Sequence, residues 1–293
     1  MSRLSRSASL ALAALGLALM HPAQAQTTVT YAQDDASAYA SDFVSVGINN
    51  TSSTQPNHGT GFNSFVFQDT GSSYAGWYLD SGKAVGTGTG QKSFGIYADL
   101  NATTTATRSF NFSPDGVTPI VAGATTPLFA GQTLNASFQN RDIATGKTVG
   151  FSLENTAGTA LVTFDFLGGT ADYRIPGSVP TSPPTPPVLP YTSGGLNTSF
   201  TLTGANAYTF TATNIDGTGS VTQSGTFTGA IDRIVYFDNQ AGPNSDTAFS
   251  ALSITAPDVA AAPEPSQMAA LSICALGLGG LMLARRRQNM RLA

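Results

Sequence analysis

The carboxylates are the side chains of this sequence with the most obvious catalytic potential. Retaining glycosidases need two carboxyl groups about 5 Å apart, one as nucleophile and one as acid/base. The chain has two Glu residues, Glu154 and Glu264. Many Asp residues stand in turn-like contexts such as Asp115-Gly116, and Asp before Gly favours turns. The sequence therefore predicts no catalytic residue, and we expect a protein that is not an enzyme. A polysaccharide hydrolase or lyase that uses Asp residues is the alternative.

Other catalytic residue types are scarce. Downstream of residue 25 the chain has one His, His58, and its one Cys is Cys274. A Ser-His-Asp triad needs a His beside both a buried Asp and a nucleophile. Cys274 lies in an apolar stretch, so the sequence supplies neither a disulfide framework nor a Cys-ligated zinc site. We expect His58 to be an exposed loop residue.

One polar loop has the residue types that bind calcium. Asp238, Asn239, Asn244 and Asp246 surround Gly242-Pro243 directly after an apolar run. Calcium takes six to eight oxygen ligands, often from flexible loops. The sequence predicts these four residues as calcium ligands, and the alternative is a plain polar hairpin loop.

Two adjacent aromatic residues are candidates for sugar binding. Trp77 is the only Trp of the chain, and Tyr78 follows it. Neighbouring residues of a strand point to opposite faces, so one of the two would face solvent and stack on a sugar ring. The sequence leaves open which one faces outward.

Charge excludes one class of partner. Charged residues make up 10% of the chain, and residues 26–258 hold seven Lys or Arg against sixteen Asp or Glu, a net charge of about −9. Proteins that bind nucleic acid need a basic surface for the phosphates. We therefore expect no nucleic-acid partner.

The middle of the chain shows the period-two alternation of β-strands. Short runs rich in Thr, Val, Phe and Tyr are separated by Gly, Asn, Asp or Pro, and sustained helical spacing of apolar residues is absent from residues 26–258. Many short strands with turn residues between them predict an all-β protein, a two-sheet antiparallel jelly-roll sandwich. The clearest runs are residues 62–67, 92–97, 108–112, 133–139, 149–153, 161–166, 198–202, 208–212, 226–227, 231–237 and 248–255.

A proline-rich segment interrupts these runs at residues 179–190. Proline lacks the N–H that a sheet needs, so we expect an extended polyproline II loop. It could instead link two domains, but residues 191–258 are few for a separate sandwich. We therefore predict one domain over residues 26–258.

The N-terminal residues 1–25 have the three parts of a secretory signal peptide. A basic start with Arg3 and Arg6 precedes an apolar run, and Ala23 and Ala25 match the small residues at a cleavage site. We predict cleavage after Ala25.

The C-terminal residues 259–293 combine a linker with a membrane anchor. Pro263, Glu264 and Pro265 precede an apolar stretch, residues 266–284, which as a helix of about 28 Å would span a bilayer. The cluster of Arg285, Arg286 and Arg287 then belongs on the cytoplasmic side. The two proline residues should keep the triplet extended at the outer boundary of the membrane.

This order of a Pro-Glu-Pro triplet, one apolar span and an Arg cluster resembles the PEP-CTERM sorting signal, over about residues 262–288. The resemblance implies export by a Gram-negative bacterium, processing by the membrane protease exosortase, and association with extracellular polysaccharide. It implies cleavage near Pro263–Pro265, with a permanent membrane anchor as the alternative.

A second resemblance covers most of the middle of the chain. The order of several short motifs is similar to secreted jelly-roll modules of the concanavalin A-like lectin/glucanase kind, although the E-x-D-x-x-E strand of the glucanases is absent. This resemblance implies a carbohydrate ligand and strengthens the calcium prediction. The motifs include Gly76-Trp77-Tyr78, Ser93-Phe94-Gly95-Ile96-Tyr97-Ala98, Gly131-Gln132-Thr133-Leu134, Val149-Gly150-Phe151-Ser152-Leu153 and Ile231-Asp232-Arg233-Ile234.

The sequence thus predicts an exported, membrane-anchored protein that reaches the cell surface or the extracellular matrix. There it would bind or organise polysaccharide without catalysis. A purely structural adhesion or coat protein shares all these signals and differs only in having no affinity for sugar.

Overall fold

The computed structural model describes residues 27–47, 53–54, 57–71, 74–80, 85, 92–114, 121–175, 189–243 and 245–258. The predicted signal peptide, the sorting tail with Pro263–Pro265 and Arg285–Arg287, and most of the proline-rich loop lie outside the described residues. Among the described residues, no helix has the length and apolar character needed to cross a bilayer.

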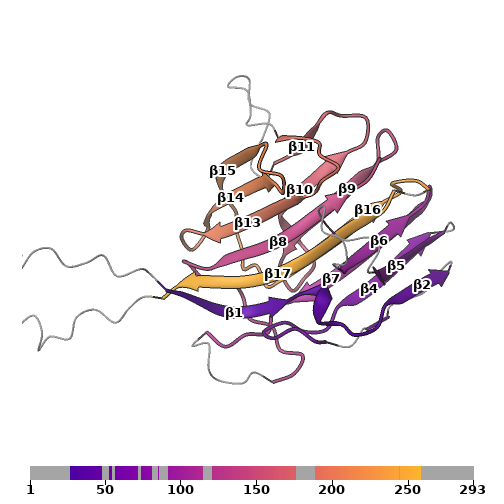
Figure 1. The fold of residues 1–293 in the computed structure, drawn as a ribbon. Coiled ribbons are helices and arrows are strands. Elements are labelled where there is room, and N and C mark those ends of the chain that lie inside the picture. The colour runs from indigo at the N-terminus through magenta and orange to yellow at the C-terminus, as the bar shows by residue number, and fades with distance from the viewer. Residues whose placement is uncertain are drawn as a thin grey trace, which may run out of the picture. The chain divides into compact units, whose positions relative to one another are not determined.

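The described strands form two antiparallel sheets that face each other (Figure 1). The nine-stranded sheet has the order β15 (Ser220–Thr226), β14 (Ala207–Asn214), β13 (Leu196–Leu202), β8 (Thr133–Asn140), β17 (Thr247–Pro257), β6 (Ser93–Ala98), β5 (Ala75–Asp80) and β2 (Phe43–Gly47), and β1 (Thr28–Asp34) also pairs with β17. The eight-stranded sheet has the order β12 (Leu189–Pro190), β11 (Asp172–Arg174), β10 (Ala160–Leu167), β9 (Thr148–Glu154), β16 (Arg233–Asn239), β7 (Ala102–Ser109), β4 (Val66–Gly71) and β3 (Ser53–Thr54).

Aromatic rings fill the space between the sheets. Tyr236 of β16 stacks on Phe249 of β17 with 3.9 Å between ring centroids, and Phe67 of β4 stacks on Trp77 of β5 at 5.4 Å. Strands such as β8 and β14 bury every second residue, so one face of each strand contacts this core and the other faces outward. Burial of these rings on opposite sheets is what holds the two sheets together.

The prediction of an all-β, two-sheet antiparallel sandwich is confirmed, and the jelly-roll connectivity stays a prediction. The alternating runs locate β6, β8, β9, β10, β13, β14, β16 and β17 to within a few residues, whereas the run over residues 108–112 overlaps only the last two residues of β7 (Ala102–Ser109). The run over residues 62–67 is extended, but the strand begins only at Val66. Strands β1 and β2 were not predicted, because Asp, Ala and Ser interrupt their apolar pattern. The one helix among the described residues is the short 3-10 helix η1 (Ala36–Ala38).

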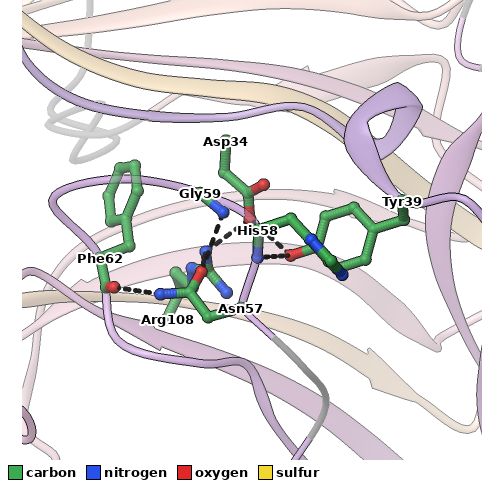
Figure 2. Close-up of polar contacts among 7 residues, drawn as sticks. All are labelled: Asp34, Tyr39, Asn57, His58, Gly59, Phe62 and Arg108. Carbon is green, nitrogen blue, oxygen red and sulfur yellow. Dashed lines mark hydrogen bonds and ion pairs between the residues drawn. The ribbon is translucent and has the colours of Figure 1, made fainter.

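One charged pair lies inside this sandwich (Figure 2). The Arg108 side chain of β7 is 0% exposed, and its Nη2 lies 2.5 Å from Oδ2 of Asp34 at the end of β1. The same nitrogen donates to Asn57 Oδ1 at 2.7 Å, and the Tyr39 hydroxyl donates to Asp34 Oδ2 at 3.1 Å. The guanidinium carbon also lies 4.4 Å from the centroid of the Phe65 ring. Three segments that are distant in the sequence, residues 34–39, residues 57–65 and β7, therefore meet at one ion pair.

Gly59 is required for this close packing. A Cβ atom at this position would lie 2.7 Å from Asp34 Cβ and 2.8 Å from Arg108 Nη2. His58 is exposed, as predicted, and its ring packs edge-on against Tyr39 with 4.7 Å between centroids. His58 has no second catalytic group among its described contacts and serves to cover the buried pair.

We predict that breaking this pair destabilises the fold strongly. Arg108→Met or Asp34→Leu alone should lower the free energy of unfolding by about 3–5 kcal/mol, because each leaves a buried charge without its partner. The double variant should lose much less than the sum, because a buried ion pair replaced by apolar groups is often neutral. Urea denaturation of the full chain measures all three values.

The pair of Arg174 and Asp165, with the Arg174 side chain 49% exposed, provides the control. Arg174→Met should cost only about 0–1 kcal/mol, as is usual for surface ion pairs. A loss in Arg108→Met no larger than in this control would contradict the structural role of the buried pair.

Candidate functional site

Both residues of the predicted aromatic site are buried. Trp77 is 1% exposed and Tyr78 is 3% exposed. Trp77 faces the core, and Tyr78 lies on the other face of β5, flat against Gly95 of β6, where a Cβ atom would lie 2.0 Å from its ring. Burial, followed by the nearby Asp246 carboxylate, raises the pKa of Tyr78. The prediction that one of these rings faces solvent and stacks on a sugar is therefore wrong.

Tyr74 and Tyr97 form a second aromatic pair near Trp77 and Tyr78. Tyr74, just before β5, is 47% exposed, and its ring centroid is 5.1 Å from that of Tyr97 on β6. Tyr97 points away from the core because its neighbours Ile96 and Ala98 point into it. This pair offers the exposed aromatic surface that was expected of Trp77 and Tyr78. The sequence signal was the alternation in β6, which places Tyr97 on the outer face.

The predicted calcium ligands do not converge on one point. Asp238 is buried, with its Oδ1 accepting the Ala241 N–H at 3.0 Å, whereas Asn239 lies on the opposite face of β16 and donates to Thr148 Oγ1 at 3.2 Å. Asn244 lies outside the described residues, and Asp246 is buried near Tyr78. Among the described residues, no group of three or more His, Cys, Asp or Glu could hold a metal ion. The four residues do not fit a shared calcium site, and we derive no step through calcium.

Asp238 is instead a buried carboxyl group whose neutral form is favoured. Burial raises its pKa well above the ordinary value, and the Asp246 and Asp99 carboxylates act in the same direction, whereas the N–H of Ala241 lowers it. Its Oδ2 has no hydrogen-bond partner among the described residues. The charged form is therefore costly at this position.

Glu154, the only Glu of the predicted mature domain, takes part in an ion pair. Its Oε2 lies 2.9 Å from Arg233 Nη2, and Ser152 Oγ donates to its Oε1 at 2.7 Å. Asp232 is close in sequence to this pair, and burial raises its pKa. Asp232 directly precedes β16 and is buried, and its N–H donates to the Glu154 carbonyl oxygen at 3.0 Å. We expect Glu154 to stabilise the pairing of β9 and β16.

The most extended polar feature is on the outer face of the nine-stranded sheet. The outward residues of β15, β14, β13, β8, β17 and β1 line up across the strands in three rows, which we call the hydroxyl face. Every member is Ser, Thr, Asn or Gln. The first row is Ser224, Thr209, Thr201, Thr133, Thr255 and Thr30, the second is Thr222, Thr211, Ser199, Asn135, Ser253 and Gln33, and the third is Ser220, Thr213, Asn197, Ser137 and Ser250.

Neighbouring members of the rows are hydrogen-bonded across the strands. Thr133 and Thr201 lie 2.8 Å apart between their hydroxyl oxygens, Thr211 and Thr222 lie 3.0 Å apart, and Ser137 donates to Asn197 at 2.9 Å. Such pairs stabilise a sheet. Each hydroxyl has one donor and two acceptor sites, so a single cross-strand bond leaves capacity toward solvent. Adjacent strands are about 4.8 Å apart and successive rows about 6.8 Å apart, which makes a regular array of polar groups.

The outer face of the eight-stranded sheet differs in chemistry. It carries the ion pairs of Arg233 with Glu154 and of Arg174 with Asp165. The hydroxyl face has no charged residue in its three rows. Sequence reasoning took the outward Thr and Ser residues only as the solvent side of each strand. Their alignment depends on the order and register of strands far apart in the chain.

Comparison with known proteins gives similarity of structure alone. No family model matches the chain, and no curated protein matches it. The cellulose-induced protein Cip1 is 11% identical, with a TM-score of 0.36 over 72% of this chain and 90% of that one. The CBM2 module of the evolved Dit protein of Lactobacillus casei BL23 phage J-1 is 12% identical, with a TM-score of 0.36 over 79% and 99%. A family 16 glycosyl hydrolase from Mycobacterium smegmatis is 9% identical, with a TM-score of 0.26 over 78% and 98%. These scores are too low to assign a ligand or an activity.

We predict that Asp238→Asn stabilises the protein increasingly as the pH rises. A carboxyl group whose pKa is raised in the folded state stabilises fully below its unfolded pKa of about 4, and this contribution is lost as the pH rises through the folded pKa. Asn keeps the acceptor for Ala241 but carries no charge. Urea denaturation at pH 4.5 and 7.5 should therefore show a larger gain at pH 7.5.

Asp216 provides a control whose pKa is shifted in the opposite direction. The Thr218 hydroxyl and N–H lower the pKa of this exposed carboxyl group, so its contribution is lost as the pH falls. Both pH values lie above the ordinary carboxyl pKa of about 4, so Asp216→Asn should change the stability by nearly the same amount at pH 7.5 and at pH 4.5. If the gain from Asp238→Asn is the same at both pH values, Asp238 is not a buried neutral acid.

Proposed function

We propose that the protein is a noncatalytic, exported module that binds a neutral polysaccharide through the hydroxyl face. The observation that carries this proposal is the array of uncharged hydroxyl and amide side chains, aligned over six neighbouring strands. A polysaccharide chain presents hydroxyl groups at regular intervals along its length, and each is both a donor and an acceptor. An array of side chains with the same double capacity suits such a partner, directly or through bridging water.

The negative net charge of the domain favours a neutral polysaccharide over an anionic one. Residues 26–258 have a net charge of about −9, so an anionic polymer would be repelled at low and moderate salt. The rows themselves offer no Lys or Arg that would pair with a carboxylate or sulfate. The exposed ring of Tyr74 and the half-buried ring of Tyr97 add an apolar surface on which a sugar ring can stack.

The described carboxylates support a binding role over catalysis. Glu154 is engaged by Arg233 and Ser152, and its neighbour Asp232 is buried. A retaining mechanism needs two carboxyl groups that face one bound substrate about 5 Å apart. We therefore favour a binding module over a hydrolase or lyase.

Export and sorting complete the proposal. The signal-like residues 1–25 and the Pro-Glu-Pro tail with its Arg cluster support passage across the inner membrane of a Gram-negative bacterium and recognition there by an exosortase-type protease. Cleavage near Pro263–Pro265 would release the acidic domain from its membrane helix into the matrix. A domain that binds neutral polysaccharide would then be held at the cell surface by that polymer.

Affinity electrophoresis tests the binding function. The full chain should migrate more slowly in gels that contain at least one of four neutral polysaccharides, namely amylose, laminarin, dextran and arabinoxylan. The double variant Thr201→Val/Thr211→Val should bind about tenfold more weakly, because two hydrogen bonds of about 0.5–1.5 kcal/mol each are lost. Val keeps the shape and the β propensity of Thr, so the sheet should remain intact.

Thr163→Val on β10 is the matched control, because Thr163 is exposed on the outer face of the other sheet. It should bind like the parent. Unretarded migration of the full chain in all four gels would contradict the proposed function. Release of reducing sugar that disappears in Glu154→Gln would show instead that the protein is a glycosidase.

A further inference from the structure

Two paired strands of the hydroxyl face each contain a register shift. The pairing of β1 with β17 shifts register between Thr30 and Ala32, and the pairing of β17 with β8 shifts between Ser250 and Ser253. Ala251 lies in the second irregularity and has a φ of 51°. A residue other than Gly rarely adopts this left-handed conformation, and such strain gathers at functional sites. Bulges are also frequent next to binding and active sites.

These irregularities frame a pocket of about 230 Å³ on the surface. Its polar lining comes from both strands and from the residue that follows β1. Two of the lining residues belong to the first row of the hydroxyl face and two belong to the second, so the pocket lies between the last two members of each row. The lining includes Thr30, Thr255, Gln33, Ser253, Asp35 and the strained Ala251.

The position of the pocket decides which part of a polysaccharide it suits. Among the named strands β1 pairs with β17 alone, so the first row ends at β1 and therefore at the pocket, whereas Gln33 of the second row also forms an isolated bridge with Thr60. The volume is below the roughly 300–1,000 Å³ of sites for drug-sized ligands. A polymer that follows the rows across the strands would reach the pocket with its last unit.

The chemistry of the lining suits sugar hydroxyl groups more than a cation. The amide of Gln33 supplies donors and an acceptor, and the side chains of Thr30 and Ser253 supply hydroxyl groups. The Asp35 carboxylate already accepts the Ser37 N–H at 2.8 Å, and Asp34, which also borders the pocket, is paired with Arg108 at 2.5 Å. The buried ion pair thus fixes the end of β1 and neutralises the acidic residue beside the pocket.

We propose that this pocket binds the terminal sugar residue of a neutral polysaccharide whose chain lies along the hydroxyl face. The proposal rests on the proposed function and adds that the protein recognises chain ends. The terminal ring would occupy the pocket between β1 and β17, and the preceding units would follow the rows toward β8 and β13.

Free monosaccharides and chain length provide the test. Saturation-transfer NMR with the full chain should detect binding of at least one of glucose, galactose, mannose and xylose. The same sugar should compete with the polysaccharide that retards the protein best among amylose, laminarin, dextran and arabinoxylan. At equal mass, a partially hydrolysed sample of that polysaccharide should bind more protein than the intact sample, in proportion to its number of chain ends.

Two pocket variants make the test specific. Gln33→Ala removes the amide at an exposed position, and Ser253→Leu fills the pocket; each should weaken binding of the monosaccharide about tenfold. Thr163→Leu, at an exposed position on the outer face of the other sheet, should leave monosaccharide binding unchanged. Circular dichroism confirms the fold of each variant, and Gln33→Ala keeps the test decisive if Ser253→Leu fails to fold.

The outcomes separate the two proposals. Retardation by a polysaccharide without monosaccharide binding, or with binding that depends on mass and not on chain ends, would overturn chain-end recognition and leave the hydroxyl face as the binding surface. Unchanged monosaccharide binding in Gln33→Ala and in a folded Ser253→Leu would overturn the assignment to this pocket. Migration unaffected by any of the four polysaccharides would overturn the proposed function and, with it, this inference.

Discussion

The buried ion pair between Arg108 and Asp34 fixes the position of β1, and the outer face of the nine-stranded sheet depends on that position. A guanidinium removed from water must find its partners inside the protein. Here Asp34 at the end of β1 and Asn57 bind Arg108, and the Tyr39 hydroxyl donates to Asp34. Burial raises the pKa of Asp34, while the charge of Arg108 and the Tyr39 hydroxyl lower it. The energetic penalty for separating these groups is large, so β1 is held beside β17.

The features proposed for function follow from this placement. With β1 beside β17, Thr30 continues the first row of the hydroxyl face and Gln33 continues the second. Residues next to the register shifts of β1 and β17, namely Thr30, Ala251 and Ser253, line the pocket. The charged pair therefore acts on the surface indirectly, by positioning a strand.

Strand alternation made most of the fold predictable from the sequence. In β8, β13 and β14 every second residue is apolar, and this pattern alone identifies both the strand and its buried face. The alternation also places Thr, Ser and Asn residues outward. That these residues form rows could not be predicted, because the register of β14, β13, β8 and β17 joins segments far apart in the chain, such as Asn135 and Ser253, which are 118 residues apart. The apolar alternation within one strand does not show which strands pair with it.

The predictions of site residues were wrong where residues distant in the sequence determine whether a side chain is buried. An aromatic pair such as Trp77 and Tyr78 should have one exposed member in a strand with one solvated face, but β5 is buried on both faces and Gly95 accommodates the Tyr78 ring. Asp238 and Asn239 are adjacent residues of β16, so their side chains point to opposite faces of the strand. The sequence prediction had placed both in a loop, where they could have bound the same ion. Arg108 begins an alternating run, and Arg is rarely fully buried unless paired. Its partner Asp34 is 74 residues away along the chain.

The central claim is that a neutral polysaccharide contacts the outer face of the nine-stranded sheet, and NMR of Thr methyl groups tests it directly. Both sheets carry outward Thr residues, which makes the second sheet an internal control. Titration with the polysaccharide that retards the protein best should shift the methyl signals of Thr133, Thr201, Thr211 and Thr255 and leave those of Thr103, Thr105, Thr107 and Thr163 in place. Shifts confined to the second group, or equal shifts in both groups, would contradict the account.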